Sequence, residues 1–207
     1  MEIDGLHLVW LGHAGFKVKS NNIVIYIDPY QIEEDEKADI VLITHDHYDH
    51  CSKEDVEKIT KDDTIIVCNE ASAKKLGVQA KIIDAGKTID VMGIKITAVP
   101  AYNIGKEFHP KGYGLGFIID IAGKRIYHAG DTDVIPEMRD IKDIDIALFP
   151  VGGTYTMNAE EAVEAAELIK PRIAIPMHYG SIVGTANDAE LFKELYSGRA
   201  YILKKGL

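Results

Sequence analysis

The chain has 207 residues, of which 46% are hydrophobic, and this is enough to bury the core of one domain. Acidic residues outnumber basic residues by 33 to 23, and the formal net charge is −10. A chain with this charge balance offers no basic face for nucleic acid or for an anionic membrane surface, so we expect neither partner. We predict a single domain over residues 1–207.

Cysteine content and the N-terminal stretch bear on the cellular compartment. The two cysteines, Cys51 and Cys68, are too few for a disulfide framework, which favours a reducing environment. The opening stretch "MEIDGLHLVW" is acidic and lacks a basic region followed by a long apolar run. It therefore predicts neither a signal peptide nor a membrane span, and we expect a cytoplasmic protein.

Short β-rich runs dominate the first quarter of the chain. The stretches "LHLVWLG", "GFKVKS" and "IVIYID" are separated by turn residues and predict an antiparallel meander. Further apolar strands are predicted at 38–44, 63–68, 93–100, 115–121, 124–130, 145–150 and 172–177. Several of these runs are too apolar to have one wet face, so we expect them to be central strands covered by helices.

Helix signals lie between the predicted strands. Capping-box spacing predicts helices that begin after Ser52 and after Asn158, and Pro171 should end the second of them. Two further helices, at 71–76 and 189–196, should each end at the glycine that follows, Gly77 or Gly198. The alternation of sheet and helix predicts a layered α/β or α+β domain.

The stretch "THDHYDHCS" carries the strongest chemical signal. It places three histidines and two aspartates between His45 and His50, where a buried strand ends and before the predicted helix. Imidazoles two residues apart can converge on one point, while Asp49 and His50 face another. Neutral imidazole and carboxylate are ligands that zinc-like divalent metals prefer. A solvated polar loop is the alternative, but three histidines with aspartate at this spacing argue against it.

The segment "HDHYDH" has the form His-x-His-x-Asp-His and resembles the signature of metallo-β-lactamase-fold hydrolases. The likeness extends along the chain through "VPAYN", "YHAGDTD" and "IPMHYG". It is closest to stand-alone metal-dependent hydrolases that are distantly similar to ascorbate-phosphate lactonases. The resemblance implies an α/β (α+β) fold of four layers, an αββα sandwich, and a metal centre, but it names no substrate.

The resemblance also implies a set of ligands for two divalent metal ions, with Zn²⁺ favoured and Mn²⁺ or Fe²⁺ as alternatives. The first metal would be bound by His45 and His47, the second by Asp49, His50 and His178, and Asp131 would bridge the two. Taken alone, Asp131 could be a turn carboxylate beside Gly130 and His178 a histidine at a strand end. Together with the motif, both are expected to be ligands.

The third ligand of the first metal is open between two residues. The register after "ITAVPA" puts Asn103 where relatives carry a histidine, and His109 follows six residues later, before "GYGLGFI". We favour His109 because imidazole binds zinc well and an amide binds it poorly. Asn103 would then support the ligands or face the substrate.

Two further residues are weaker candidates. Asp28 ends "IVIYID" and could orient a ligating histidine through its second ring nitrogen. Asp28 could equally be a turn residue that precedes Pro29 and has no role at the site. His13 in "LGHAG" could line the pocket, although a turn histidine between glycines is the commoner case.

The implied chemistry is metal-assisted hydrolysis. Metal binding lowers the pKa of a water molecule from about 15.7 towards about 7, and the resulting hydroxide attacks an ester-like bond of a small molecule, with Asp49 able to accept a proton. The bond could be that of a lactone, thioester, amide or phosphodiester. The alternatives are a di-iron redox protein, against which His47 speaks because those relatives carry Glu there, and a catalytically silent metal-binding protein. The sequence indicates no particular oligomeric state.

Overall fold

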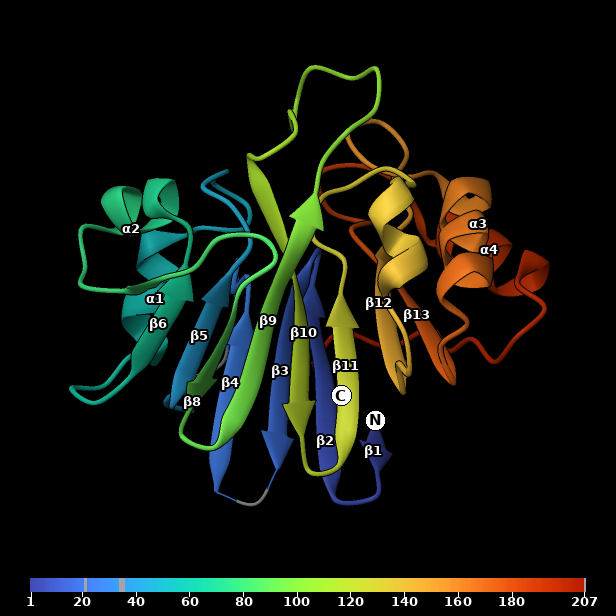
Figure 1. Cartoon of the computed structure of the whole chain (residues 1–207). Helices are drawn as coiled ribbons and strands as arrows, with labels where there is room; N and C mark the ends of the chain where they lie inside the picture. Colours follow the sequence, from blue (N-terminus) through green and yellow to red (C-terminus); the bar gives the residue numbers. More distant parts are fainter. Residues whose placement is uncertain (21, 34–35, 207) are drawn as a thin grey trace. The chain divides into compact units, whose positions relative to one another are not determined.

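Residues 1–84 and 203–207 form one unit of the computed structural model, and residues 85–202 form a second. The structure describes residues 1–20, 22–33 and 36–206. Each unit has its own mixed sheet (Figure 1). Whether the two units together make the single predicted domain stays a prediction.

The first unit contains a seven-stranded sheet whose strands follow one another in chain order. Its strands are β1 (Glu2–Ile3), β2 (Leu6–Gly12), β3 (Gly15–Ser20), β4 (Ile23–Ile27), β5 (Ile40–Ile43), β6 (Ile65–Cys68) and β7 (Lys81–Ile82). Strands β1 to β4 are antiparallel, which confirms the predicted meander, and β4 to β7 are parallel. Helices α1 (Lys53–Ile59) and α2 (Glu70–Leu76) make the crossovers from β5 to β6 and from β6 to β7.

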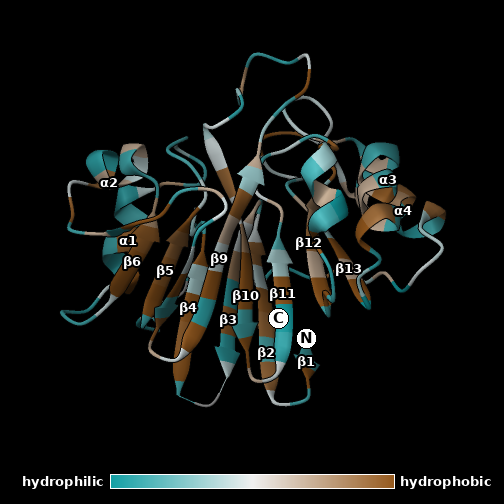
Figure 2. Ribbon diagram, in the orientation of Figure 1, coloured by the Kyte–Doolittle hydropathy of each residue, from teal (hydrophilic) through white to brown (hydrophobic). Residues whose placement is uncertain are grey.

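The apolar strands of this unit pack under its helices. All four residues of β5 are buried, and Figure 2 shows β5 and β6 as largely hydrophobic. Val56 and Ile59 of α1 share a core cluster with Tyr26 and Val41 of the sheet. Burying both faces in this way explains why β5 lacks the polar alternation of a half-exposed strand.

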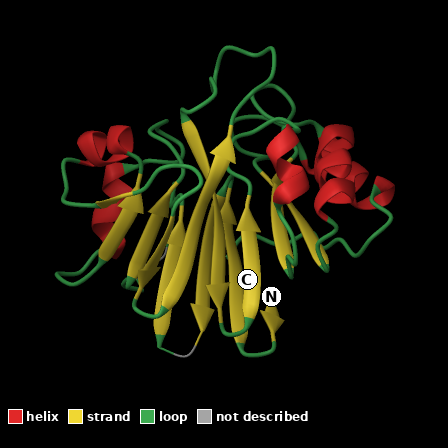
Figure 3. Ribbon diagram, viewed as in Figure 1, coloured by secondary structure: helices red, strands yellow, loops and turns green. Residues whose placement is uncertain are grey.

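The second unit contains a six-stranded sheet in the order β13-β12-β11-β10-β9-β8. Its strands are β8 (Thr88–Val91), β9 (Ile94–Ala101), β10 (Gly114–Ile121), β11 (Lys124–His128), β12 (Ile146–Pro150) and β13 (Ile173–Met177). Strands β8 to β11 are antiparallel and β11 to β13 are parallel. A 3-10 helix, η1 (Pro136–Asp140), and the helices α3 (Ala159–Ile169) and α4 (Ala186–Leu195) lie in this unit (Figure 3).

Most predicted element boundaries hold. The Asn158–Glu161 capping box starts α3, and Gly77 ends α2 in the left-handed conformation at φ 70°. The prediction for the last helix was wrong at both ends. The helix begins at Ala186, because Thr185 forms a capping box with Asp188, and it ends at Leu195, because the next residue is extended. The short strands β1, β7 and β8 and the helix η1 were not predicted.

The described residues thus form two mixed sheets and four α-helices, which confirms the predicted mixed α/β class. In this part of the chain, every helix is too short or too polar to cross a membrane.

Candidate metal centre

The loop that follows β5 is held at its base by Asp28, which comes directly after the neighbouring strand β4. The Thr44 backbone N–H donates to Asp28 Oδ1 at 2.8 Å and the Thr44 hydroxyl donates to Oδ2 at 2.6 Å. His50 Nδ1 lies 2.7 Å from Asp28 Oδ2, and neither side chain is exposed. Asp28 therefore fixes the His50 ring by its Nδ1 atom, and Nε2 faces Asp49 Oδ2 at 3.7 Å. This is the orienting role that the sequence suggested for Asp28.

His45 and His47 converge as their spacing predicted. His45 Nε2 lies 3.1 Å from His47 Nδ1, while the other His45 nitrogen, Nδ1, lies 2.9 Å from Thr44 Oγ1. The two rings meet edge to face with centroids 4.7 Å apart. Two imidazole nitrogens at this separation can bind the same ion.

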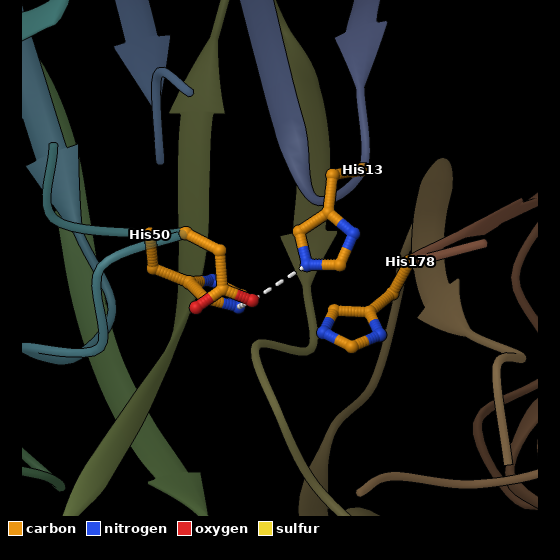
Figure 4. A group of neighbouring side chains, drawn as sticks. His13, His50 and His178 are labelled. Carbon is orange, nitrogen blue, oxygen red and sulfur yellow. Dashed lines mark hydrogen bonds and ion pairs between the residues drawn. The ribbon is translucent and has the colours of Figure 1, made fainter. Parts of the chain in front are cut away.

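His13 is the site residue that sequence reasoning undervalued. Its Nε2 atom lies 2.9 Å from Asp49 Oδ2, the contact drawn as a dashed line in Figure 4. His13, Asp49 and His50 each offer a ligand atom, and these atoms lie within 4.8 Å of one another. The available signal was local: His13 occupies the turn between β2 and β3, a place where glycine or asparagine is usual.

Three candidate site residues, two in the first unit and one in the second, have a backbone that side chains seldom adopt. Asp28, His13 and His178 have φ values of 44°, 48° and 60°. Such left-handed residues cost of the order of 1–3 kcal/mol each and are concentrated at functional sites. Six other described non-glycine residues share this conformation, among them Met92 and Ala122, so the backbone alone does not mark these positions as functional.

In the second unit, Asp131 lies between two histidines from distant parts of the chain. Its Oδ2 atom is 3.3 Å from His109 Nε2 and 3.1 Å from His178 Nε2, and all three side chains are almost fully buried. Gly130 makes this placement possible, since a Cβ there would lie 2.4 Å from the carbonyl oxygen of Leu115. The sequence placed Asp131 and His178 after the ends of two apolar strands, which are β11 and β13 on either side of β12, and the structure brings their side chains together.

The loop between β9 and β10 separates the roles of Asn103 and His109. Asn103 Oδ1 accepts a hydrogen bond from the His109 backbone N–H at 3.0 Å and lies 3.0 Å from the ring atom Nδ1. The Asn103 amide donates to Asp133 Oδ1 and to the Tyr155 carbonyl, at 3.0 and 2.9 Å. Asn103 therefore orients the His109 ring, whose Nε2 faces Asp131. That His109 binds the metal stays a prediction.

Two nearby groups are unsuited to direct chemistry. Burial raises the pKa of the Cys51 thiol to about 11, so this residue stays protonated near neutral pH and does not resemble a ligating thiolate. The Tyr102 hydroxyl donates a hydrogen bond to Glu137 Oε2 at 2.8 Å, so its proton is already used.

Comparison with known proteins identifies the family of the chain. Residues 7–178 match the family model for the β-lactamase superfamily domain. A UPF0173 metal-dependent hydrolase of Thermoplasma acidophilum is 37% identical, over 93% of this chain and 92% of that protein. A second, from Methanopyrus kandleri, is 31% identical over 91% of this chain and 90% of that protein.

Solved structures give the same result. A Parabacteroides distasonis protein matches with a TM-score of 0.87 at 37% identity, covering 96% of this chain and 94% of the other. A metallo hydrolase from Ignicoccus hospitalis matches with a TM-score of 0.81 at 26% identity, covering 98% and 96%.

The chain belongs to the metallo-β-lactamase superfamily, which confirms the resemblance carried by "HDHYDH". Its function is that of a metal-dependent hydrolase, with a cluster of histidines and aspartates able to bind metal.

Proposed function

We propose that this hydrolase binds two divalent metal ions, most suitably Zn²⁺, and cleaves an ester-like bond of a small molecule. The first ion would be held by His45, His47 and His109, the second by Asp49, His50 and His178, with Asp131 shared between them. Mn²⁺ and Fe²⁺ are the alternative metals. We also propose a cytoplasmic location, since Cys51 and Cys68 are both free thiols.

The spacing of nitrogen and oxygen atoms around Asp131 carries this proposal. Zinc binds such atoms at about 2.0–2.2 Å in a tetrahedron, which places neighbouring ligand atoms about 3.3 Å apart. The His109 and His178 Nε2 atoms lie 3.3 and 3.1 Å from Asp131 Oδ2. The set contains five imidazoles and two carboxylates, a mixture that suits zinc better than Mg²⁺ or Ca²⁺, which favour oxygen.

Chemically, a bound divalent ion supplies a Lewis acid and a water molecule of lowered pKa. The residues of the chain provide the rest. Asp49 would accept the proton of the attacking water, and His13, whose Nε2 atom lies 2.9 Å from Asp49 Oδ2, would hold the carboxylate in position. Asp28 holds the His50 ring in the same manner at 2.7 Å.

The test is metal analysis joined to an activity panel. The purified chain, loaded with Zn²⁺, Mn²⁺ or Fe²⁺ and freed of excess metal, should retain close to two ions per chain by elemental analysis. It should hydrolyse at least one of a lactone, a thioester, an amide and a phosphodiester, and a chelator should abolish that hydrolysis. Retention of no metal, or hydrolysis that persists after verified metal removal, would contradict the proposal.

A further inference from the structure

The loop between β9 and β10 exposes apolar side chains next to a proposed metal ligand. His109 is buried in this loop, whereas Phe108, directly before it, is 48% exposed and Ile104 is 56% exposed. The loop extends beyond the ends of β9 and β10 in Figure 1. Large apolar side chains that stay exposed on a folded surface can mark a binding site.

This loop is anchored by polar contacts. The buried Asp133 carboxylate accepts hydrogen bonds from the Ile104 backbone N–H at 2.8 Å and from the Lys106 ammonium at 2.6 Å. The Phe108 ring packs edge-on against Tyr155, with centroids 4.6 Å apart and an interplanar angle of 81°. The apolar side chains are therefore presented by a fixed backbone, which lowers the entropic cost of binding a ligand.

The lysines of this loop are already neutralised. Lys106 pairs with Asp133 at 2.6 Å, and Lys111 pairs with Glu137 at 2.8 Å. A lysine paired with a carboxylate attracts a second anion weakly, and the chain as a whole carries a net charge of −10. This part of the site is thus better suited to a neutral apolar group than to a phosphate.

The first unit repeats the pattern. Tyr48 lies between the proposed ligands His47 and Asp49 and is 60% exposed, the highest value among the large hydrophobic side chains described. Its ring meets Tyr30 edge-on, with centroids 5.9 Å apart. In both units, an exposed aromatic side chain directly adjoins a proposed ligand in the sequence.

We propose that the substrate carries an apolar group, an acyl chain or an aromatic ring, on the acyl side of the scissile bond, and that Phe108 and Ile104 bind this group. The inference rests on the proposed hydrolytic function and names its substrate class. Hydrolysis of such an ester consumes one water molecule, breaks the bond between the acyl carbon and the ester oxygen, and releases a carboxylic acid and an alcohol.

The test uses ligands that need no turnover. Octanohydroxamate and acetohydroxamate share a metal-chelating head group and differ only in their apolar chain. Burying about two methylene groups raises affinity roughly tenfold. Calorimetry on the zinc-loaded chain should therefore find octanohydroxamate bound at least about tenfold more tightly than acetohydroxamate. The double variant Phe108→Ser, Ile104→Ser should bring that ratio close to one.

Met92→Ser is the matched control, because Met92 is 52% exposed in the turn between β8 and β9 and should leave the ratio intact. Equal affinities for the two hydroxamates, or the same ratio in the double variant as in the parent, would overturn the inference. A chain that binds the hydroxamates with the expected ratio but hydrolyses nothing in the panel would refute only the proposed function. The parallel panel of octanoyl and acetyl esters should show the same ratio in kcat/KM, and a preference for the acetyl ester would count against the apolar group.

Discussion

Replacing Asn103 with alanine isolates the part of the site that orients His109. The side chain is buried and contacts the His109 backbone N–H and ring Nδ1, both at 3.0 Å, as well as Asp133 and the Tyr155 carbonyl. Alanine leaves the two His109 groups without this acceptor, and each buried group that loses its partner costs about 1–3 kcal/mol. Asp133 keeps two other donors, so the two His109 groups dominate, and we expect a total loss of roughly 2–6 kcal/mol in the free energy of unfolding.

The consequence for metal binding is separate from the loss of stability. Removing a hydrogen-bonding partner of a ligating histidine typically lowers metal affinity by about 10- to 100-fold. Asn103→Ala should therefore retain both ions at saturating metal while binding one of them more weakly, whereas His109→Ala should lose close to one ion per chain. Urea unfolding of the metal-free chain measures the first effect, and competitive zinc titration with elemental analysis measures the second.

Asn69→Ala is a suitable control for this experiment. Asn69 caps α2 by accepting from the Ser72 N–H at 2.9 Å, so its loss should cost about 1 kcal/mol of stability without changing zinc affinity. If Asn103→Ala binds zinc as tightly as the parent, Asn103 does not orient a ligand. If Asn103→Ala loses an ion while His109→Ala keeps two, then Asn103 is the ligand and His109 is not.

Four further outcomes are expected. Removing the metal should lower the Tm in calorimetry, since an ion that binds only the folded chain adds stability by mass action, and an unchanged Tm after verified removal would contradict this. His13→Ala should weaken zinc binding about 10- to 100-fold in a competition titration, because Asp49 loses a contact of 2.9 Å; unaltered affinity would make His13 a mere turn residue. Asn158→Ala should cost about 1 kcal/mol in urea unfolding by removing the cap of α3, and a loss near zero would mean that the cap is dispensable. Burial alone would raise the pKa of Asp55, but hydrogen bonds, led by that from Ser52, lower it. The stability that Asp55 contributes should be present above pH about 4 and lost as the pH falls through this lowered pKa. The free energy of unfolding should therefore differ less between pH 7 and pH 3 in Asp55→Ala than in the parent chain.

Much of the fold could be predicted from local patterns. An apolar run such as that of β5 must be buried wherever it lies, and a cap such as Asn158 satisfies the first turn of its own helix. These interactions act over a few residues and can be seen in the sequence directly. The short strands β1, β7 and β8 lack such a signal, because pairing with a neighbouring strand, rather than their own composition, makes them strands.

Some residues of the candidate site could also be predicted from the sequence, whereas others could not. The motif from His45 to His50 and the polar residues Asp131 and His178 could be named from the sequence, because each follows an apolar strand that ends abruptly. Which of Asn103 and His109 faces Asp131 was decided by the path of the loop between them.

Tertiary structure alone gave His13 its role. It brings the His13 ring to Asp49, 36 residues away along the chain, through the pairing of β2, β3, β4 and β5. No local pattern encodes that contact, because the chain between the two residues is positioned by sheet hydrogen bonds and core packing. Residue types and strand ends therefore indicated the chemistry, while the fold selected which atoms meet, since a contact between distant residues depends on every element that lies between them.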